Sequence, residues 1–205
     1  MVTRKAVAKR NRPDPESHPR TTLRRVNWSE DLDVVHRFFS DYRQWVADHQ
    51  EGIGLLDSGR SDGLDMIDAQ IAGLPGAYGP PHGEVLLAFD QEAIVACGAL
   101  RELEPKVAEI KRLYVRADHR GGGFGKRLTS ALLERARELG YERVRVDTLS
   151  TMAAAIQFYQ ELGFRPIPSY WAHPAPGALF FEYRVSQSSG PPRRPGATKS
   201  KRPRK

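Results

Sequence analysis

The chain has 205 residues, of which 40% are hydrophobic, which is enough for one globular domain with modest tails. Its 32 Lys/Arg and 25 Asp/Glu give a net charge of +7, and Cys97 is the only cysteine. One cysteine excludes an internal disulfide, and no apolar run approaches the roughly 18 residues that cross a membrane. The basic start lacks the apolar region of a secretory signal, so we expect a cytoplasmic protein without membrane contact.

The positive charge is concentrated at the two ends of the chain. Residues 1–25 hold eight Lys/Arg and two acids, and residues 186–205 hold seven Lys/Arg and no acids, whereas the residues between them are acidic overall. The ends also lack periodic apolar residues. We therefore predict disordered basic tails at 1–20 and 186–205 around a folded domain at 21–185. Such tails suit a weak contact with nucleic acid, which we do not expect to be the function.

The first part of the domain predicts one strand and two helices. Residues 21–26 form a short strand, and Ser29 stands where a helix N-cap belongs. Apolar residues then recur at three- and four-residue steps from Leu32 to Val46, which is one face of a helix. A second stripe of this kind runs from Leu64 to Leu74 and stops at Pro75-Gly76.

The rest of the domain alternates strands with helices. The pattern predicts strands at 84–89, 93–103, 107–115, 143–149, 164–167 and 178–185, and helices at 124–139 and 153–162. The first two of these strands can form a hairpin. The segment from 107 to 149 reads as strand, helix and strand, which predicts a crossover connection and an α/β arrangement.

The strongest chemical signal is the segment Arg120-Gly121-Gly122-Gly123-Phe124-Gly125-Lys126, which follows a predicted strand and opens a predicted helix. Glycines let the backbone turn sharply and approach a ligand closely. The helix start offers unpaired N–H groups and the positive end of its dipole, which suit a phosphate. Arg120 and Lys126 add charge for the same anion. An ordinary tight turn would explain one of these glycines but not four.

Two common nucleotide-binding motifs do not fit this segment. A Walker P-loop requires Ser or Thr after Gly-Lys, and Arg127 stands at that position. A Gly-x-Gly-x-x-Gly fingerprint that starts at Gly121 meets Lys126, and one that starts at Gly123 meets Leu128. The sequence therefore indicates a different phosphate-binding turn.

Three segments together resemble the GNAT superfamily of acetyltransferases. The turn fits the pattern Arg/Gln-x-x-Gly-x-Gly/Ala with Arg120, Gly123 and Gly125. Residues 108–115, Ala-Glu-Ile-Lys-Arg-Leu-Tyr-Val, look like the family's fourth strand. Residues 155–164 are similar to its second signature, Ala-x-x-Leu/Phe-Tyr-x-x-x-Gly-Phe. The pieces occur in the family's order and span most of the chain.

The resemblance implies a fold and a cosubstrate. It implies a GNAT-type mixed, mostly antiparallel twisted sheet of about seven strands, flanked by about four helices. Members bind acetyl-CoA, with the amides of the turn around its pyrophosphate and the backbone after a bulge in the fourth strand along its pantetheine arm. The implied coenzyme-binding residues are Leu113, Tyr114, Val115, Arg120, Gly121, Gly122, Gly123, Phe124, Gly125 and Lys126.

The resemblance also implies transfer of an acetyl group to an amine, which must lose a proton because lysine-like amines have a pKa of about 10.4. Glu109 matches a catalytic glutamate of several GNAT enzymes and is the candidate base. The other interpretation is a structural ion pair of Glu109 with Lys111 or Arg112. Tyr159, in the second signature, is the candidate acid for the thiolate, or else a buried aromatic. A backbone N–H near Leu113 would hold the oxyanion.

The acceptor is not specified by the sequence. Acidic residues between Asp31 and Asp68 form either a rim that attracts a cationic amine or a solvated helix face. Tyr170-Trp171 and the loop up to Gly177 either stack on the substrate or pack the last hairpin. The six histidines lack metal-ligand spacing, so no metal site is expected. The alternative to an enzyme is a non-catalytic acyl-CoA-binding regulatory module, and we expect a monomer or a homodimer.

Overall fold

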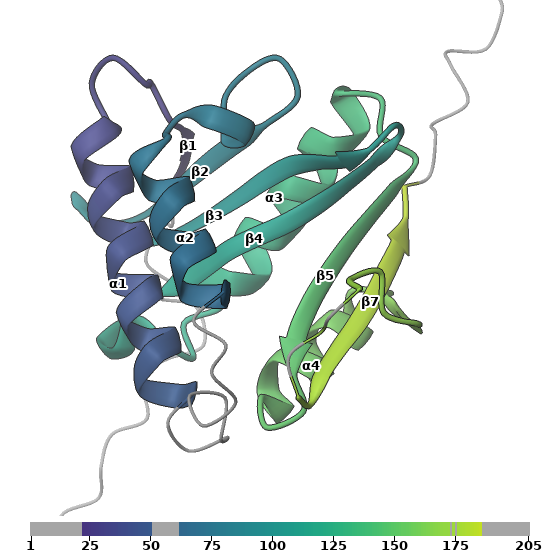
Figure 1. Ribbon diagram of the computed structural model, residues 1–205. Coiled ribbons are helices and arrows are strands. Elements are labelled where there is room, and N and C mark those ends of the chain that lie inside the picture. Colours follow the sequence, from purple (N-terminus) through teal and green to yellow (C-terminus); the bar gives the residue numbers. More distant parts are fainter. Residues whose placement is uncertain (1–21, 51–61, 173, 175, 186–205) are drawn as a thin grey trace, which may run out of the picture.

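Seven strands form one open sheet in the part of the chain that the computed structural model describes, residues 22–50, 62–172, 174 and 176–185. They are β1 (Thr22–Arg25), β2 (Glu84–Asp90), β3 (Ala93–Glu104), β4 (Val107–Val115), β5 (Arg143–Leu149), β6 (Arg165–Ile167) and β7 (Ala178–Arg184). The strand order is β1-β2-β3-β4-β5-β7-β6, and only β4 and β5 are parallel neighbours (Figure 1). The mixed, mostly antiparallel α/β sheet is confirmed, while the predicted tails lie outside the described residues.

Four α-helices flank this sheet within the described residues. They are α1 (Leu32–Gln50), α2 (Asp62–Ala72), α3 (Phe124–Glu138) and α4 (Ala153–Glu161). Alternation along the strands divides the apolar residues between the two faces. Val85 and Leu87 pack with α1, whereas Leu86 and Ala88 pack with α3. The helices α1 and α2 cover one face, and α3 lies behind the other (Figure 1).

The start of α1 differs from the prediction. The helix begins at Leu32, and its first turn is closed by the Val35 N–H, which donates to the Asp31 carbonyl at 2.9 Å. Ser29 lies two residues further out, and its hydroxyl donates to the Asn27 side chain at 2.8 Å. The assignment of Ser29 as the N-cap was therefore wrong, because a turn at residues 27–31 places Asp31 next to the helix.

The two parallel strands diverge soon after they meet. β4 pairs with β5 only from Val107, opposite Arg143, to Glu109, opposite Arg145. Beyond Glu109 the facing edge of β4 has no partner strand in the part of the chain that the structure describes, and Figure 1 shows the two ribbons separating. We call this divergence the splay. It leaves backbone N–H and C=O groups of β4 available in the middle of a sheet, where a ligand can pair with them.

A bulge in β4 accompanies the splay. The register between β3 and β4 shifts between Cys97 and Ala99, and Arg112 has a φ of 55°. Because of the extra residue, Lys111 and Arg112 both face the side of α1 and α2, while Leu113 packs into the core under α3. The bulge implied by the family resemblance is thus present in β4.

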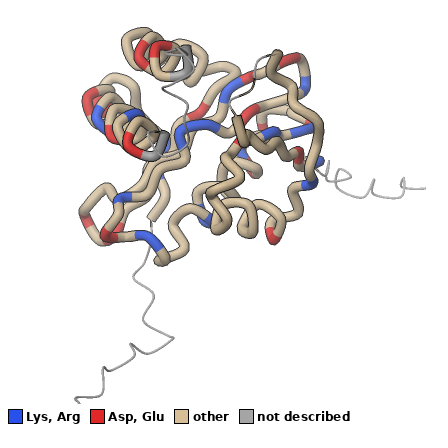
Figure 2. The backbone as a smooth tube through the Cα atoms, turned by 60° about the horizontal axis from the view of Figure 1, so that its bottom comes forward, with Lys and Arg blue, Asp and Glu red and all other residues tan. Residues whose placement is uncertain are grey.

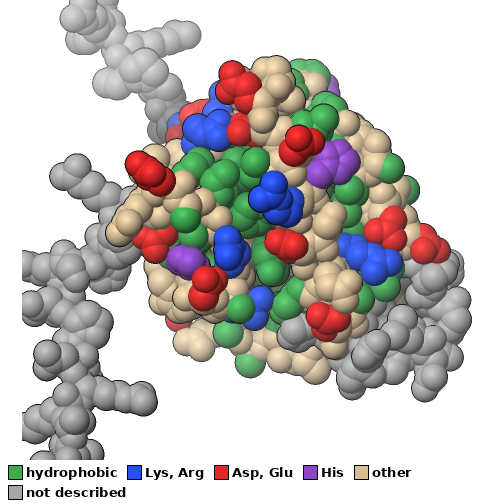
Figure 3. Space-filling view, turned by 90° about the vertical axis from the view of Figure 1, so that its left-hand side faces the viewer, with side chains coloured by type: hydrophobic (Ala, Val, Ile, Leu, Met, Phe, Trp, Pro, Cys, Tyr) green, Lys and Arg blue, Asp and Glu red, His purple; other side chains and the backbone are tan. Residues whose placement is uncertain are grey.

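Charge is unevenly spread over the first two helices. Both carry acidic residues, and α2 has no Lys or Arg at all (Figure 2). On the side of α1, apolar side chains lie between acidic and basic ones (Figure 3), and a hollow of ≈ 340 Å³ is lined by α1 and the β2–β3 turn. Within the described residues, no helix is both long and apolar enough to span a membrane.

Candidate functional site

The glycine-rich turn is built by backbone conformations that other residues adopt at a cost. Gly121 and Gly123 have φ values of 82° and 76°, in the left-handed region. A Cβ at Gly122 would lie 2.9 Å from the ring of Phe124. Gly123 occupies the N-cap position of α3 without a side-chain cap. The glycines thus bring the chain tightly into α3 and leave the helix start uncovered.

The helix start presents free hydrogen-bond donors. The Arg127 N–H closes the first turn on the Gly123 carbonyl at 3.1 Å. The N–H groups of the three residues before it, Phe124, Gly125 and Lys126, find no acceptor among the described residues. Unpaired N–H groups at the positive end of a helix dipole form a site for an anion such as a diphosphate.

Basic side chains brace this turn. The Arg120 Nε donates to the Val115 carbonyl at 3.1 Å, and its guanidinium lies 5.6 Å from the ring centroid of Trp45 on α1. The Arg127 guanidinium donates to the Gly122 carbonyl at 2.7 Å. Lys126 is more exposed and lies 3.9 Å from Glu161. The turn therefore joins β4, α1 and α3, and keeps positive charge around the free N–H groups.

The three β4 residues that the resemblance assigned to the coenzyme use their side chains for packing. Leu113 and Val115 pack in the core under α3, and Tyr114 meets Phe38 of α1 edge-on at 6.4 Å between ring centroids. Their side chains are thus held in the two cores. What remains for a ligand in the splay is their backbone, as the resemblance implied.

Glu109 is fully buried and heavily contacted. Its Oε2 accepts two hydrogen bonds from Arg101, from Nε at 2.9 Å and from a terminal nitrogen at 2.7 Å. Its Oε1 accepts a 2.9 Å hydrogen bond from the Tyr170 hydroxyl and lies 3.3 Å from the Lys111 Nζ. The ion pair with Lys111 is present. Arg112 bonds to Gln70 instead, and the second cation paired with Glu109 is Arg101.

Lys111 connects the two diverging strands. Its Nζ lies 2.6 Å from the Asp147 carboxylate on β5, just beyond the last paired residues of β4 and β5. Burial opposes the charged form of Lys111, but the carboxylates of Asp147 and Glu109 outweigh it and raise the pKa of the ammonium. Lys111 therefore keeps its charge at neutral pH, and the partly exposed Asp147 lies at the mouth of the splay.

The segment between β6 and β7 closes over these groups. Besides bonding to Glu109, Tyr170 packs edge-on against Phe180 at 5.0 Å between centroids. The ring of Trp171 has the Arg101 guanidinium at 5.7 Å and the Lys111 ammonium at 5.5 Å. Tyr170 and Trp171 thus form a wall over the buried ion pairs. His173 and Ala175 of the predicted aromatic loop lie outside the described residues.

Tyr159 is buried on the opposite face of the sheet from Glu109, in the core shared with α3. Its ring contacts Phe158, Phe164 and Phe181, and its hydroxyl bonds to none of the described residues. Burial raises the pKa of Tyr159, and Asp147 and Tyr42 add to the effect. The hydroxyl is therefore protonated at neutral pH and lies within the electrostatic reach of Asp147, at the splay.

The two candidate catalytic residues thus approach the splay from different faces. Glu109 and Asp147 belong to the face of α1 and α2, and Tyr159 belongs to the face of α3 and α4. A thioester held in the splay would meet a proton acceptor on one side and a donor on the other. Such an arrangement suits acyl transfer, in which the nucleophile loses a proton and the leaving group gains one.

Sequence reasoning missed Arg101 and Asp147. Arg101 could have been found from the hairpin between β3 and β4, because an antiparallel register around its turn places Arg101 opposite Glu109. Asp147 had no such signal, because its partner Lys111 lies 36 positions away along the chain, on a strand reached through α3.

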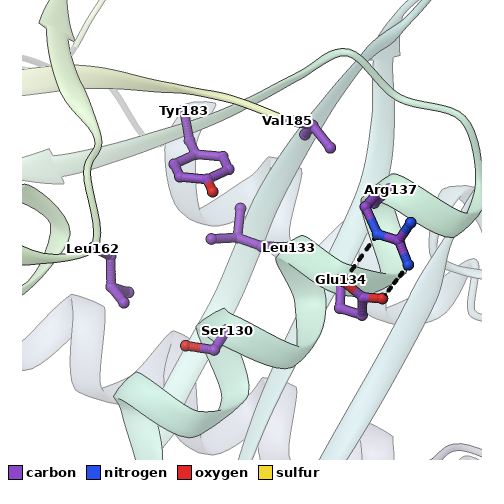
Figure 4. Close-up of a pocket in the computed structure, with 7 residues that line it drawn as sticks. All are labelled: Ser130, Leu133, Glu134, Arg137, Leu162, Tyr183 and Val185. Carbon is purple, nitrogen blue, oxygen red and sulfur yellow. Dashed lines mark hydrogen bonds and ion pairs between the residues drawn. The ribbon is translucent and has the colours of Figure 1, made fainter. Parts of the chain in front are cut away.

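A separate pocket of ≈ 320 Å³ lies between α3 and β7 (Figure 4). It is lined by Ser130, Leu133, Glu134, Arg137, Leu162, Tyr183 and Val185. Leu133, Leu162 and Tyr183 belong to the core side of α3, so this pocket is not part of the site around Glu109. Among the described residues, no group of three or more His, Cys, Asp or Glu side chains is placed to hold a metal ion.

Comparison with known proteins gives consistent matches. A family model described as "Acetyltransferase (GNAT) family" matches residues 39–164. An uncharacterised N-acetyltransferase of Schizosaccharomyces pombe is 32% identical over 131 residues, which cover 61% of this chain and 80% of that protein.

Solved structures match over a larger share of the chain. A candidate acyl-CoA N-acyltransferase of Klebsiella pneumoniae superposes with a TM-score of 0.60 at 21% identity, over 82% of this chain and 99% of the other. A candidate acetyltransferase of Salmonella typhimurium, solved with its cofactor acetyl-CoA, gives a TM-score of 0.54 at 17% identity, over 83% and 97% of the two chains. At these identities the likeness establishes the fold.

Proposed function

The chain belongs to the acetyltransferase (GNAT) family, and from this premise we propose that it is an N-acetyltransferase that moves an acetyl group from acetyl-CoA to an amine. The observation that carries the proposal is the continuity between two sets of unpaired backbone groups. One is the β4 edge in the splay, and the other is the row of free N–H groups at the start of α3. A short turn joins them, so one extended ligand can use both.

Acetyl-CoA has the shape that this arrangement requires. Its diphosphate would accept hydrogen bonds from the N–H groups of Phe124, Gly125 and Lys126, beside the charge of Lys126. Its pantetheine arm carries amides that can pair with the backbone of β4 beyond Lys111. The thioester would then lie in the splay. The Leu113 N–H is our candidate donor for the oxyanion.

We assign the proton transfers to the two faces of the splay. Glu109 is inaccessible to solvent, so the amine proton would reach it through the Tyr170 hydroxyl that bonds to it or through a water molecule. Tyr159, whose hydroxyl is protonated and unpaired among the described residues, would protonate the departing thiolate. This places the amine on the side of α1, α2 and the Tyr170-Trp171 wall. The acidic residues of α1 and α2 support a cationic ammonium as the group that approaches.

A thiol-release assay tests the proposal. The full chain with acetyl-CoA is offered small amines, amino acids, polyamines and peptides, and we expect acceptor-dependent release of CoA with at least one class. Mass spectrometry should find the product heavier by one acetyl group on nitrogen. Tight binding of acetyl-CoA without release to any acceptor would instead favour a regulatory module that binds acyl-CoA.

A further inference from the structure

Arg112 is a buried guanidinium that no carboxylate accompanies among the described residues. Only 5% of Arg112 is exposed to solvent. One terminal nitrogen donates to the Gln70 Oε1 at 2.5 Å, the guanidinium lies 5.2 Å from the ring centroid of Tyr42, and Nε is buried without a partner. A buried charge without a counter-ion is costly, so its presence calls for an explanation.

The cations next to Arg112 are differently placed. Arg101 is paired with Glu109, and Lys111 is paired with both Glu109 and Asp147. These groups and Arg112 belong to one cluster, because Arg112, Arg101, Lys111 and Glu109 all act electrostatically on the hydroxyl of buried Tyr78. Among the described residues of this cluster, three cations therefore face two carboxylates, and the unbalanced charge is that of Arg112.

Neutral groups hold Arg112 in place. The Gln70 Oε1 accepts from Arg112 and also from the Tyr78 hydroxyl at 2.7 Å, and Tyr42 supports the guanidinium with its ring. Such contacts orient a guanidinium but leave its charge uncompensated. A fork that is held in this way is prepared to bind a planar anion through two parallel hydrogen bonds.

The position of Arg112 points to the acceptor side of the site. The bulge places it directly after Lys111, on the face of α1 and α2 where Glu109 also lies. Three residues along a strand span roughly 10 Å. A ligand of the size of an amino acid, with an amine near the Tyr170–Glu109 pair, could therefore reach Arg112 with an acidic group.

We propose that the acceptor is an amine that also carries a carboxylate, as amino acids do, and that Arg112 binds this carboxylate. The inference rests on the proposed N-acetyltransferase function and adds the class of substrate. It also gives a role to both kinds of charge at the site. The acidic residues of α1 and α2 would attract the ammonium group of a zwitterion, and Arg112 would bind its carboxylate.

The test compares each amino acid with its primary amide and with the matching decarboxylated amine, by the rate of CoA release. For the wild-type chain we expect kcat/KM to fall roughly 10- to 100-fold when the carboxylate is replaced by the amide, since hydrogen bonds to charged groups contribute that much. Arg112→Met should abolish this preference, and Arg112→Lys should retain part of it. Arg43→Met is the matched control, because Arg43 pairs with Asp68 on the outer side of α1 and α2, and it should keep the wild-type ratio.

A second measurement does not depend on turnover. Calorimetry of the CoA-loaded chain with N-acetyl amino acids and their amides should show the same preference for the carboxylate, lost in Arg112→Met. If the best acceptors lack a carboxylate, or neither assay shows the preference, the inference is overturned while N-acetylation stands. If CoA is released with none of the acceptors, the result contradicts the proposed N-acetyltransferase function instead. The calorimetry then tests by itself whether Arg112 binds a carboxylate.

Two further measurements distinguish carboxylate binding by Arg112 from a coenzyme contact and from a structural ion pair. Affinity for acetyl-CoA should be unchanged in Arg112→Met, and a loss would make Arg112 a coenzyme contact instead. The unliganded variant should melt no lower than the wild type, because an apolar replacement for an unpaired buried charge is neutral or stabilising. Glu51 and Asp57 are acidic residues in the segment 51–61, outside the described residues. A lower melting temperature, matched by Glu51→Gln or Asp57→Asn, would identify a structural counter-ion and overturn the inference.

Discussion

At the scale of single residues, the candidate site separates groups that build it from groups that we propose to react. Gly121 and Gly123 are required for their backbone angles, whereas Gly125 has an ordinary φ, and a Cβ there would make only an ordinary van der Waals contact. Glu109 is enclosed by donors, and the Tyr159 hydroxyl is not bonded to any described residue. Substitutions can therefore be chosen that change the chemistry and leave the fold intact.

Gly125→Asp should weaken acetyl-CoA binding without unfolding the chain. The nearest atom to a new Cβ would be a Val115 methyl at 3.9 Å, so the fold accepts a side chain. A carboxylate there would repel the diphosphate, and we expect affinity to fall by roughly 10-fold or more. Calorimetry with acetyl-CoA measures it, with Gly125→Ala as the uncharged control. Equal affinities for the two variants would place the diphosphate elsewhere.

Tyr159→Phe should lower kcat by roughly 10²–10⁴-fold and leave acetyl-CoA affinity nearly unchanged, because it removes one proton donor from a buried ring. Since burial raises the pKa of Tyr159, the wild-type donor should stay protonated from neutral pH upward to beyond the ordinary tyrosine value. Tyr183→Phe, on the far side of Phe164, is the control. Full activity of Tyr159→Phe would make Tyr159 a packing residue.

Glu109→Gln should lower the rate most at moderate pH, where free amine is scarce, by roughly 10²-fold. Raising the pH toward the pKa of the amine should restore part of the rate, because solvent then supplies the deprotonated nucleophile. The control is Glu84→Gln, which also removes a buried carboxylate paired with an arginine, Arg135, but on β2, which β3 separates from β4. Profiles of the same shape for both variants would leave Glu109 as a structural ion pair.

At the scale of elements, a polar clamp fixes the first strand to the first helix. Asp31, just before α1, accepts hydrogen bonds from both terminal nitrogens of Arg24 on β1, at 2.7 and 2.8 Å, and from the Asn27 N–H at 2.7 Å. Because α1 carries Tyr42, whose ring lies next to the Arg112 guanidinium, the clamp also helps to position the proposed acceptor side. The hydrogen bonds from Arg24 lower the pKa of Asp31 despite its burial.

Asp31→Asn should reduce the free energy of unfolding by about 1 kcal/mol at pH 7, since Arg24 is partly exposed and its pairing is screened. A lowered native pKa stabilises the fold above the unfolded value near 3.9, and this contribution is lost as the pH falls through the native pKa. Urea unfolding at pH 7 and at pH 4 or below should show the difference between wild type and variant shrinking. Asp33→Asn, in which the exposed Asp33 of the first turn of α1 is replaced, is the control. If the difference in unfolding free energy between wild type and Asp31→Asn were the same at both pH values, the clamp would be disproved.

At the scale of the whole molecule, the proposed site draws on both faces of one sheet. Because β4 and β5 separate after three paired residues, groups from the α1 side of the sheet and from the α4 side can both face the gap between them. The sheet, its four helices and both cores lie within residues 22–185.

A chain shortened to residues 21–185 should therefore keep the kcat/KM of the full chain on a small acceptor. The removed segments have no periodic apolar residues, and their net charge of +11 exceeds the +7 of the whole chain. Circular dichroism checks the fold, and the thiol-release assay checks the turnover. A folded but inactive short chain would show that one of the ends takes part in catalysis.

The sequence determined the elements and their order, because these depend on local patterns. The bounds of β4 and β5 agree with the prediction to the residue, since alternation and the flanking turns are encoded within a few positions. The glycine-rich turn was likewise legible, because left-handed angles and a helix start require particular residues at fixed spacing. The family followed from these local signals.

The tertiary structure alone decided which charges meet. The ion-pair interpretation of Glu109 gave Lys111 or Arg112 as its partner, and Glu109 pairs with Lys111 and Arg101. The bulge in β4 turns Arg112 away from Glu109, and the placement of β5 beside β4 brings Asp147 to Lys111, neither of which a local pattern encodes. The register of the β3–β4 hairpin, in contrast, could have indicated Arg101. Ser29 was wrongly assigned as a cap because the turn at residues 27–31 places Asp31 next to α1. The lack of a counter-ion for Arg112 among the described residues could not be foreseen from local patterns either. Local sequence encodes the angles of the chain, whereas the pairing of side chains far apart in sequence depends on the packed sheet and helices.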